Sequence, residues 1–565
     1  MNNELYENLN ILSNNEFENI SYYTPLEEYL DLSINRHITS YHTKINENNF
    51  YIKDKDTTNT NLQQSFVKYI PLVDFLKYLI GKYKKDNLDI LPNSIDMSKN
   101  HESKYEKCIY DVNNYSYVDS FFYYITSELK TKHNFIHGIE CFDNFICMKK
   151  NCRINIADDI EYLCDSSYFN DNLDKLYYFD DDDIKGIFSQ NKKEKIIISQ
   201  DCELLNIEEI DDNDIILQIE NVNENNDNDN LLNLNTENDK YESNTDEESN
   251  NENDDDDNDD DDDTIEPVMT SDDESDCESE YDDEDESDEN EDEEIISDES
   301  EDESEDEDEL YLNLKKIPTQ VVVLEKCENT LDYLLENDLL TIEELESVMF
   351  QIVTILYTYQ TIFRFTHNDL HTNNIMYINT DQEYLFYKIK DKTYKVPTFG
   401  KIYKIIDFGR AIYYVKDKLL CSDSFSSNGT AHTQYNFGPY YNEKKPILEP
   451  NYSFDLCRLA GSIFDFICDD IKNINKFREA TPVYDLIFSW LYDDNGRNIL
   501  YKSNGEDKYP GFRLYKAISK IVHNHIPEKQ YNHVCLKKFE INQNKGDLSL
   551  SSIMDIDSIK SSVHL

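Results

Sequence analysis

A stretch of almost uninterrupted acidic residues sets the first limit on how this chain of 565 residues can fold. Residues 251–309 contain 38 Asp or Glu and no Lys or Arg, and nine of the ten residues at 254–263 are Asp. Like charges repel one another, and the few apolar side chains here cannot offset the entropy lost on ordering. We therefore predict a disordered insertion at 151–317, with its low-complexity acidic tract at 243–309.

Charge and composition exclude several classes of protein. The stretch at 251–309 accounts for −38 of the formal net charge of −66, which disfavours direct binding to nucleic acid and permits binding to basic proteins. No apolar run approaches the roughly 18 residues that span a bilayer, and the N-terminus lacks the apolar region of a signal peptide. The twelve cysteines form no Cys-x-x-Cys pair. We expect an intracellular protein that is neither secreted nor transmembrane, and its oligomeric state stays open.

The acidic tract allows three interpretations. It can act as a solubilising linker, or it can attract basic proteins. The third is modification by acid-directed kinases at Ser271, Ser297 and Ser300, where each phosphate would add further negative charge.

Apolar patterning divides the rest of the chain. Residues 1–60 are polar with weak periodicity, which predicts a tail. A first folded part, 61–150, contains a helix at 118–129 and a pair of strands at 134–148. Folded structure resumes with a buried strand at 318–324. Because loop-closure entropy grows only with the logarithm of loop length, the two folded parts can form one unit.

The second folded part begins with a series of well-marked elements. Thr341 is a suitable helix N-cap with Glu344 three residues later, and apolar side chains then recur at helical spacing. The expected elements are a polar connector at 325–329, a short helix at 330–335, a long helix from 341, a strand at 374–377, a hairpin at 383–389 and 393–396, and a strand at 403–406.

Two motifs in this part match the chemistry of phosphoryl transfer. His367-Asn368-Asp369 is followed five residues after the Asp by Asn374, and Asp407-Phe408-Gly409 follows the strand at 403–406. In such chemistry one carboxylate orients or deprotonates the attacking hydroxyl, while an amide and a second carboxylate hold Mg²⁺. This pattern predicts Asp369 as the catalytic base and Asn374 and Asp407 as metal ligands.

The order of elements resembles the C-terminal half of the eukaryotic protein-kinase fold over about 318–525, and more weakly over 69–150. Residues 451–459 resemble the start of the buried helix whose Asp braces the catalytic loop, which makes Asp455 that brace and His367 scaffold. Residues 117–122, 133–139 and 406–411 are similar to protein kinases of the mimivirus (giant-virus) type.

This resemblance implies an α+β, two-lobed protein-kinase-like fold that uses ATP and Mg²⁺. The small lobe would comprise 61–150 and a last strand and hinge at 318–328, with the long disordered acidic insertion between them. The large helical lobe would cover 329–530, and 531–565 would be a C-terminal tail. Glu325 and Cys327 would offer backbone groups to adenine. A lysine, Lys107 or Lys104, would pair with an acid on the helix at 118–129, which we expect to be Asp119 rather than Glu128.

Parts of the kinase pattern are missing. The chain has no Gly-x-Gly-x-x-Gly turn to cover phosphates. Asn368 replaces the usual Arg before the catalytic Asp, so we expect no activation by loop phosphorylation. No Ala-Pro-Glu follows Asp407, and Thr430, Thr433 and Tyr435 are candidates for the substrate platform. His523 and His525 are interpreted as surface residues.

Three functions remain open. The first is a protein kinase that transfers the γ-phosphoryl of ATP to a protein hydroxyl, Ser or Thr, in the host cytoplasm or the virion. The second is a pseudokinase scaffold, favoured by the missing glycine turn. The third is a small-molecule phosphotransferase, which shares His-Asn-Asp and the metal-binding Asp.

Overall fold

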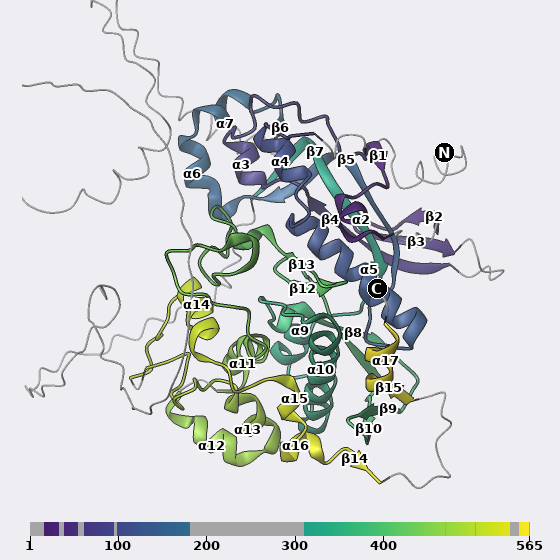
Figure 1. Ribbon diagram of the computed structural model, residues 1–565, viewed down its shortest axis with the longest axis vertical. Helices are drawn as coiled ribbons and strands as arrows, with labels where there is room; N and C mark the ends of the chain where they lie inside the picture. Colours follow the sequence, from purple (N-terminus) through teal and green to yellow (C-terminus); the bar gives the residue numbers. More distant parts are fainter. Residues whose placement is uncertain are drawn as a thin grey trace, which may run out of the picture. The chain divides into compact units, whose positions relative to one another are not determined.

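The computed structural model describes residues 16–32, 39–54, 62–94, 99–180, 310–468, 471–502, 504–542 and 553–563 (Figure 1). The chain divides into two units, one made of Met1–Lys193 with Asp306–Leu565 and the other of Glu194–Glu305. The acidic tract at 243–309, predicted to be disordered, lies outside the described residues. The first unit combines helices and sheets from both sides of that tract, so the predicted α+β class is confirmed.

The largest sheet contains strands from both sides of the tract. Its order is β1-β5-β7-β4-β3-β2, with β6 beside β7, and neighbouring strands are antiparallel. The central strand β7 carries a buried apolar run at 321–324, which confirms the predicted buried strand. The strands are β1 (Phe17–Ser21), β2 (Thr39–Lys44), β3 (Asn49–Asp54), β4 (Gln63–Pro71), β5 (Cys141–Asn155), β6 (Tyr177–Tyr178) and β7 (Tyr311–Glu325).

The polar tail predicted over 1–60 is wrong for the described residues. They form β1, β2, β3 and the helix α2 (Pro25–Leu30), and Phe50 and Ile52 are buried in the sheet. β1 pairs with β5, far along the chain. Short polar strands of this kind are stabilised by distant partners, so local periodicity signals them weakly.

Two further predicted boundaries are wrong. The expected pair of strands at 134–148 does not form, because residues 134–140 are not in a strand and 141–148 belong to the single long strand β5, whose register shifts between Cys141 and Asp143. Such a shift is a β-bulge, and the chain continues through it without the reversal that a pair of strands requires. The insertion predicted at 151–317 contains the end of β5, the helices α6 (Ile160–Asp165) and α7 (Ser167–Asn172), β6 and the start of β7.

Helix α5 (Tyr115–His133) confirms and extends the helix predicted at 118–129. It packs against β5 and β7, and Asn114 caps it by accepting a hydrogen bond from the Ser116 N–H. α3 (Phe75–Leu79) and α4 (Lys104–Ile109) precede it in the chain.

The part after β7 is mainly helical. α10 (Ile342–Phe363) begins with the predicted capping box, in which Thr341 and Glu344 bind each other's backbone N–H. No helix of the described residues combines the length and apolar character that a bilayer crossing needs. The other helices are α9 (Leu331–Glu336), α11 (Phe454–Ile467), α12 (Ile474–Ala480), α13 (Pro482–Ser489), α14 (Phe512–Ile521), α15 (Pro527–Gln530), α16 (Val534–Lys537) and α17 (Ile556–Ser562).

Small sheets complete the fold. β9 (Tyr384–Ile389) and β10 (Lys392–Pro397) form the predicted hairpin. The predicted C-terminal tail at 531–565 is wrong where it is described, because β14 (Glu540–Ile541) pairs with β10 and β15 (Ile553–Asp555) pairs with β9. The remaining strands are β8 (Ile375–Asn379), β11 (Lys401–Ile405), β12 (Ile412–Val415) and β13 (Lys418–Cys421).

Candidate active site

The loop between α10 and β8 is held by a buried carboxylate. Asp455, near the start of α11, accepts hydrogen bonds of 2.9 Å from the backbone N–H groups of both His367 and Asn368. Burial raises the pKa of Asp455, against these two hydrogen bonds. The contact that the kinase resemblance implied for Asp455 is therefore present, and it fixes the backbone next to Asp369.

His367 joins this loop to the segment that carries Asp407. Its Nδ1 accepts a hydrogen bond from the Asp369 N–H at 3.3 Å, so Nε2 carries the proton and donates to the Ile406 carbonyl at 2.9 Å. The ring is buried, and both of its nitrogens are engaged by these backbone groups. These contacts give His367 a structural role.

Pairing of β8 with β11 brings Asn374 and Asp407 to the same end of a two-stranded sheet. Ile375 lies opposite Ile405, and the Ile406 N–H donates to the Asn374 carbonyl at 3.0 Å. Asn374 Nδ2 donates to the Asp369 carbonyl at 2.9 Å. Among the described residues nothing donates to Asn374 Oδ1, which leaves this oxygen available to a cation.

Asp407 sits in a left-handed backbone conformation with φ of 64°. Its N–H donates to the Tyr123 hydroxyl at 2.9 Å, and the next N–H, of Phe408, donates to Asp119 Oδ1 at 2.6 Å. The Phe408 ring is buried, with its centroid 4.6 Å from that of Phe122. Helix α5 therefore holds this turn, and 52% of the Asp407 side chain remains exposed.

Lys68 is the basic residue of the site. On β4, Val67 points into one apolar cluster, so the next side chain points to the opposite face, towards α5. Lys68 Nζ lies 2.7 Å from Asp119 Oδ2 and 3.0 Å from Asp407 Oδ1. The nearby ammonium group lowers the pKa of Asp407 to about 2. Burial lowers the pKa of Lys68, but the two carboxylates outweigh this effect and raise it.

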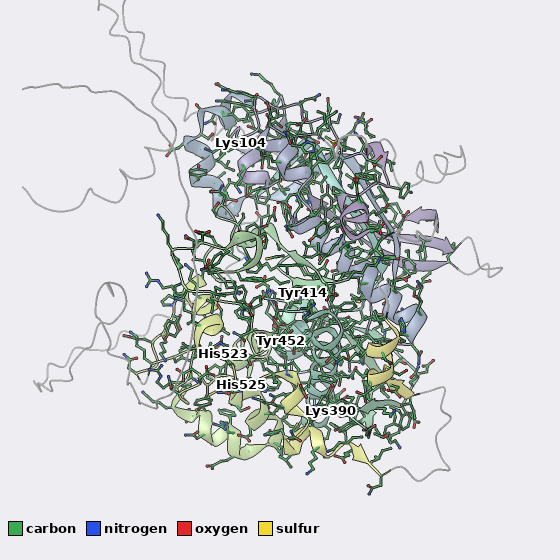
Figure 2. The ribbon with its side chains drawn as sticks, in the orientation of Figure 1. Lys104, Lys390, Tyr414, Tyr452, His523 and His525 are labelled. Carbon is green, nitrogen blue, oxygen red and sulfur yellow. The ribbon has the colours of Figure 1, made fainter. Side chains whose placement is uncertain are left out.

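Asp119 forms an ion pair, but its partner is Lys68, so the predicted partner, Lys107 or Lys104, is wrong. Lys104 and Lys107 lie on α4, and Figure 2 labels Lys104 at that helix. Neither lysine contacts Asp119 in the described part of the chain. Glu128, the alternative acid, pairs with Lys132 on its own helix. Lys68 was not predicted as a site residue because β4 begins at Gln63, next to the end of the predicted tail at residue 60.

Glu325 and Cys327, at and after the end of β7, were both predicted to offer backbone groups to adenine, and the contacts of those groups differ. The Glu325 N–H already donates to the Glu140 carbonyl at 2.9 Å, and its carboxylate lies 2.8 Å from Lys130 Nζ and 2.7 Å from Lys404 Nζ. Glu325 is thus structural, and its N–H is not free to bind adenine. For Cys327, no described residue bonds the backbone N–H or carbonyl, while burial raises the pKa of its thiol to about 12.

The Asp369 carboxylate is contacted by side chains from two other segments. The Tyr515 hydroxyl, on α14, donates to Asp369 Oδ1 at 2.8 Å, and Arg410 Nη1 lies 3.3 Å from the same oxygen. Arg458 Nε donates to the Tyr515 hydroxyl at 3.0 Å. Burial lowers the pKa of the nearby His371. An open hollow of about 520 Å³ is lined by Asp332, Asp369, His371, Thr372, Asn373, Arg410, Arg458, Ser462, Asp465, Phe466 and Tyr515.

Asn368 stands where the kinase pattern has an Arg, and its side chain makes hydrogen bonds to uncharged groups. Its Nδ2 donates to Thr366 Oγ1 and to the Arg410 carbonyl, and its Oδ1 accepts from the Tyr435 hydroxyl at 2.8 Å. Tyr435, a predicted platform residue, is buried. The segment after β13 is therefore attached to the loop between α10 and β8 by a hydrogen bond between neutral groups.

No cluster of three or more His, Cys, Asp or Glu that could hold a metal ion occurs in the described parts of the chain. His523 and His525, neighbours after α14 in Figure 2, instead contact Asp494 and the Tyr492 carbonyl. Any cation at Asn374 and Asp407 would need further oxygen ligands from a bound molecule or water.

No family model matches the chain, and none of the curated proteins compared with it matches either.

Proposed function

We propose that the chain is a protein kinase that transfers the γ-phosphoryl group of ATP to a Ser or Thr hydroxyl of a protein. Its small lobe would be the seven-stranded sheet with α5, and its large lobe the helical part after β7. The observation that carries the proposal is the ion pairing of Lys68 with both Asp119 and Asp407 beside Asn374 and Asp369. One cation, two groups with oxygens for a metal ion, and a carboxylate for the acceptor hydroxyl are what phosphoryl transfer needs.

Each side chain has a distinct role in this proposal. Asp369 orients the acceptor hydroxyl and takes its proton, while Lys68 binds phosphate oxygens. Asn374 Oδ1 and the Asp407 carboxylate would hold Mg²⁺, and their oxygen chemistry fits this ion. Bound Mg²⁺ would neutralise charge on the phosphates. The free backbone groups of Cys327 are suited to adenine.

The turn between β2 and β3 lies beside Lys68, because the Val67 N–H donates to the Asn48 carbonyl. It contains no glycine, and Asn46 Oδ1 accepts hydrogen bonds from the N–H groups of Asn48 and Asn49 at 3.1 and 2.8 Å. Those N–H groups are not free to bind phosphate. Nucleotide binding in this proposal therefore depends on Lys68 and Mg²⁺ more than on a phosphate-binding turn.

A pseudokinase scaffold is the second candidate. The occupied N–H groups of the β2–β3 turn and the Tyr515 hydroxyl on Asp369 favour it, since both reduce access to catalytic groups. Such a protein would bind partners without turning over ATP.

Incubation of the purified chain with γ-labelled ATP, Mg²⁺ and basic, acidic and small-molecule acceptors separates these functions. The proposal predicts label on Ser or Thr of a protein acceptor, and none in matched reactions with a metal chelator. Label confined to small molecules would indicate a phosphotransferase. Partner binding that needs no nucleotide, without transfer to any acceptor, would indicate a scaffold.

A further inference from the structure

A second cavity lies between the segment that follows β13 and helix α14. Its volume is about 940 Å³. None of its lining residues is Asp or Glu, although the chain has 119 acidic and only 53 basic residues. We call it the basic groove, and it is lined by Phe425, Ser427, His432, Thr433, Tyr435, Asn436, Pro439, Tyr440, Tyr441, Asn442, Lys445, Pro446, Ile447, Leu448, Lys516 and Lys520.

The three lysines of the basic groove differ in their contacts from most lysines of the large sheet. Most lysines of the large sheet form ion pairs, as Lys44 and Lys150 do. In contrast, no carboxylate of the described residues lies within ion-pair distance of Lys445, Lys516 or Lys520. Unpaired ammonium groups that line one cavity form a positive surface in an otherwise acidic protein.

The groove also offers apolar surface. Ile447 is 66% exposed and Tyr441 is 46% exposed, and both lie among the lysines of the lining. A partner that fits this surface carries several negative charges and one or two apolar or aromatic side chains.

The basic groove adjoins the catalytic loop. Lys516 follows Tyr515, whose hydroxyl binds Asp369, and Lys520 lies one turn further along the same helix. On the other wall, the hydroxyl of Tyr435 binds Asn368, the residue before Asp369. A chain bound in the groove would therefore pass close to the Asp369 carboxylate.

We propose that the basic groove binds an acidic segment of the protein acceptor, next to the hydroxyl that is phosphorylated. This inference rests on the proposed function and gives its substrate class: Ser or Thr flanked by Asp, Glu and an apolar residue. The lysines select this class by charge complementarity, and opposite charges also speed the encounter. Basic acceptors are disfavoured because the groove repels them.

Binding of a labelled peptide to the full chain without nucleotide tests this. The probe is a fluorescent peptide with one Ser, several Asp and Glu and one Phe, and a second peptide has Asn and Gln in place of the acids. The test variant combines Lys445→Gln, Lys516→Gln and Lys520→Gln. The control combines Lys476→Gln, Lys529→Gln and Lys560→Gln, which lie on α12, α15 and α17 and remove the same charge.

The proposal predicts that the acidic peptide binds the wild type and the control alike, more weakly as salt rises, and that the neutral peptide binds poorly. The groove variant should lose about tenfold in affinity, the sum expected from three exposed charge pairs. Equal binding by the groove variant would overturn the proposal. So would absence of binding to the wild type at low salt, the result expected if another part of the chain fills the groove.

The two proposals can fail separately. Groove-dependent binding without any phosphoryl transfer would support the binding role of the basic groove and contradict the proposed kinase activity. Transfer to acidic and basic acceptors with equal KM, and with the same KM in the groove variant, would support the kinase activity and contradict the binding role of the basic groove.

Discussion

Lys68 Nζ lies 3.0 Å from Asp407 Oδ1, although 339 positions separate the two residues in the chain. The contact links the large sheet to the turn after β11. It brings a cation from one folded part to the Asp407 carboxylate of the other, where the proposed magnesium–triphosphate complex would need both groups. The same ammonium group binds Asp119 at 2.7 Å, so α5 helps to position it.

Replacement of Lys68 by Met should abolish most activity. Without the ammonium group, Asp119 and Asp407 face each other as two carboxylates, and the pKa of Asp407 should rise. We expect kcat/KM for ATP to fall about 10²- to 10³-fold, as when other preorganised charge-stabilising groups are removed. Lys107→Met is the matched control and should behave as the wild type. Steady-state kinetics and nucleotide-binding titrations measure both, and equal losses in the two variants would contradict the assignment.

Asp423 should make stability depend on pH. Burial raises the pKa of Asp423 to about 7, against the hydrogen bond that it accepts from the Tyr115 N–H. The folded chain thus holds this proton more tightly than the unfolded chain, in which the pKa of Asp is about 3.9. The contribution of this proton to the free energy of unfolding is fully present below about pH 4 and is lost as the pH rises through about 7.

We therefore expect Asp423→Asn, which keeps an acceptor for that hydrogen bond, to reduce the drop in melting temperature between pH 5.5 and pH 8.5. The comparison variant is Asp417→Asn, because 95% of that side chain is exposed. Thermal unfolding of the three proteins at both pH values gives the result. An unchanged drop in Asp423→Asn would show that this carboxyl does not titrate as described.

Tyr515→Phe should increase the rate of transfer. The acceptor hydroxyl needs an oxygen of Asp369, and the Tyr515 hydroxyl now occupies Oδ1. Loss of one hydrogen bond, worth about 0.5–1.5 kcal/mol, corresponds to a two- to tenfold gain in kcat/KM for the acceptor. Tyr509→Phe on the preceding loop serves as control. A marked fall in rate for Tyr515→Phe would mean instead that the tyrosine helps to orient Asp369.

Asp455→Ala should destabilise the fold and disorder the catalytic loop. It leaves the buried N–H groups of His367 and Asn368 without an acceptor. Each unsatisfied group costs about 1–3 kcal/mol, so we expect a loss of roughly 3 kcal/mol in the free energy of unfolding. Urea denaturation measures it, with Asp465→Ala, an exposed position on the same helix, as the control. A loss of unfolding free energy smaller than that of the control would show that Asp455 does not stabilise the loop.

Local sequence signals predicted the second folded part well. The capping box at Thr341 and the apolar spacing behind it set the start of α10. The strand after Asn374 and the strand before Asp407 have short, apolar, clearly bounded patterns. The Asp455 contact came from a motif rather than from periodicity. These features are encoded within a few neighbouring residues, which is why one sequence suffices to find them.

The first folded part was predicted less well because its strands are specified by distant partners. β1 and β3 contain few apolar residues, and their burial depends on β5 and β4. Lys68 has a local signal, since it lies between Val67 and Tyr69 in an apolar run of the predicted folded part 61–150, but the resemblance to protein kinases begins only at residue 69. Tyr515 has no such signal, because nothing near it in the sequence indicates that α14 contacts Asp369.

Phosphoryl transfer by variants of Asp369 and Asp407 tests most directly whether these side chains act on the terminal phosphate. Initial rates of label transfer from γ-labelled ATP to a protein acceptor would be compared for the wild type, Asp369→Asn and Asp407→Asn, with circular dichroism to verify the fold. Removal of a general base lowers rates about 10²- to 10⁴-fold, and we predict losses of at least that size in both variants. Undiminished transfer by both folded variants would contradict the proposed kinase.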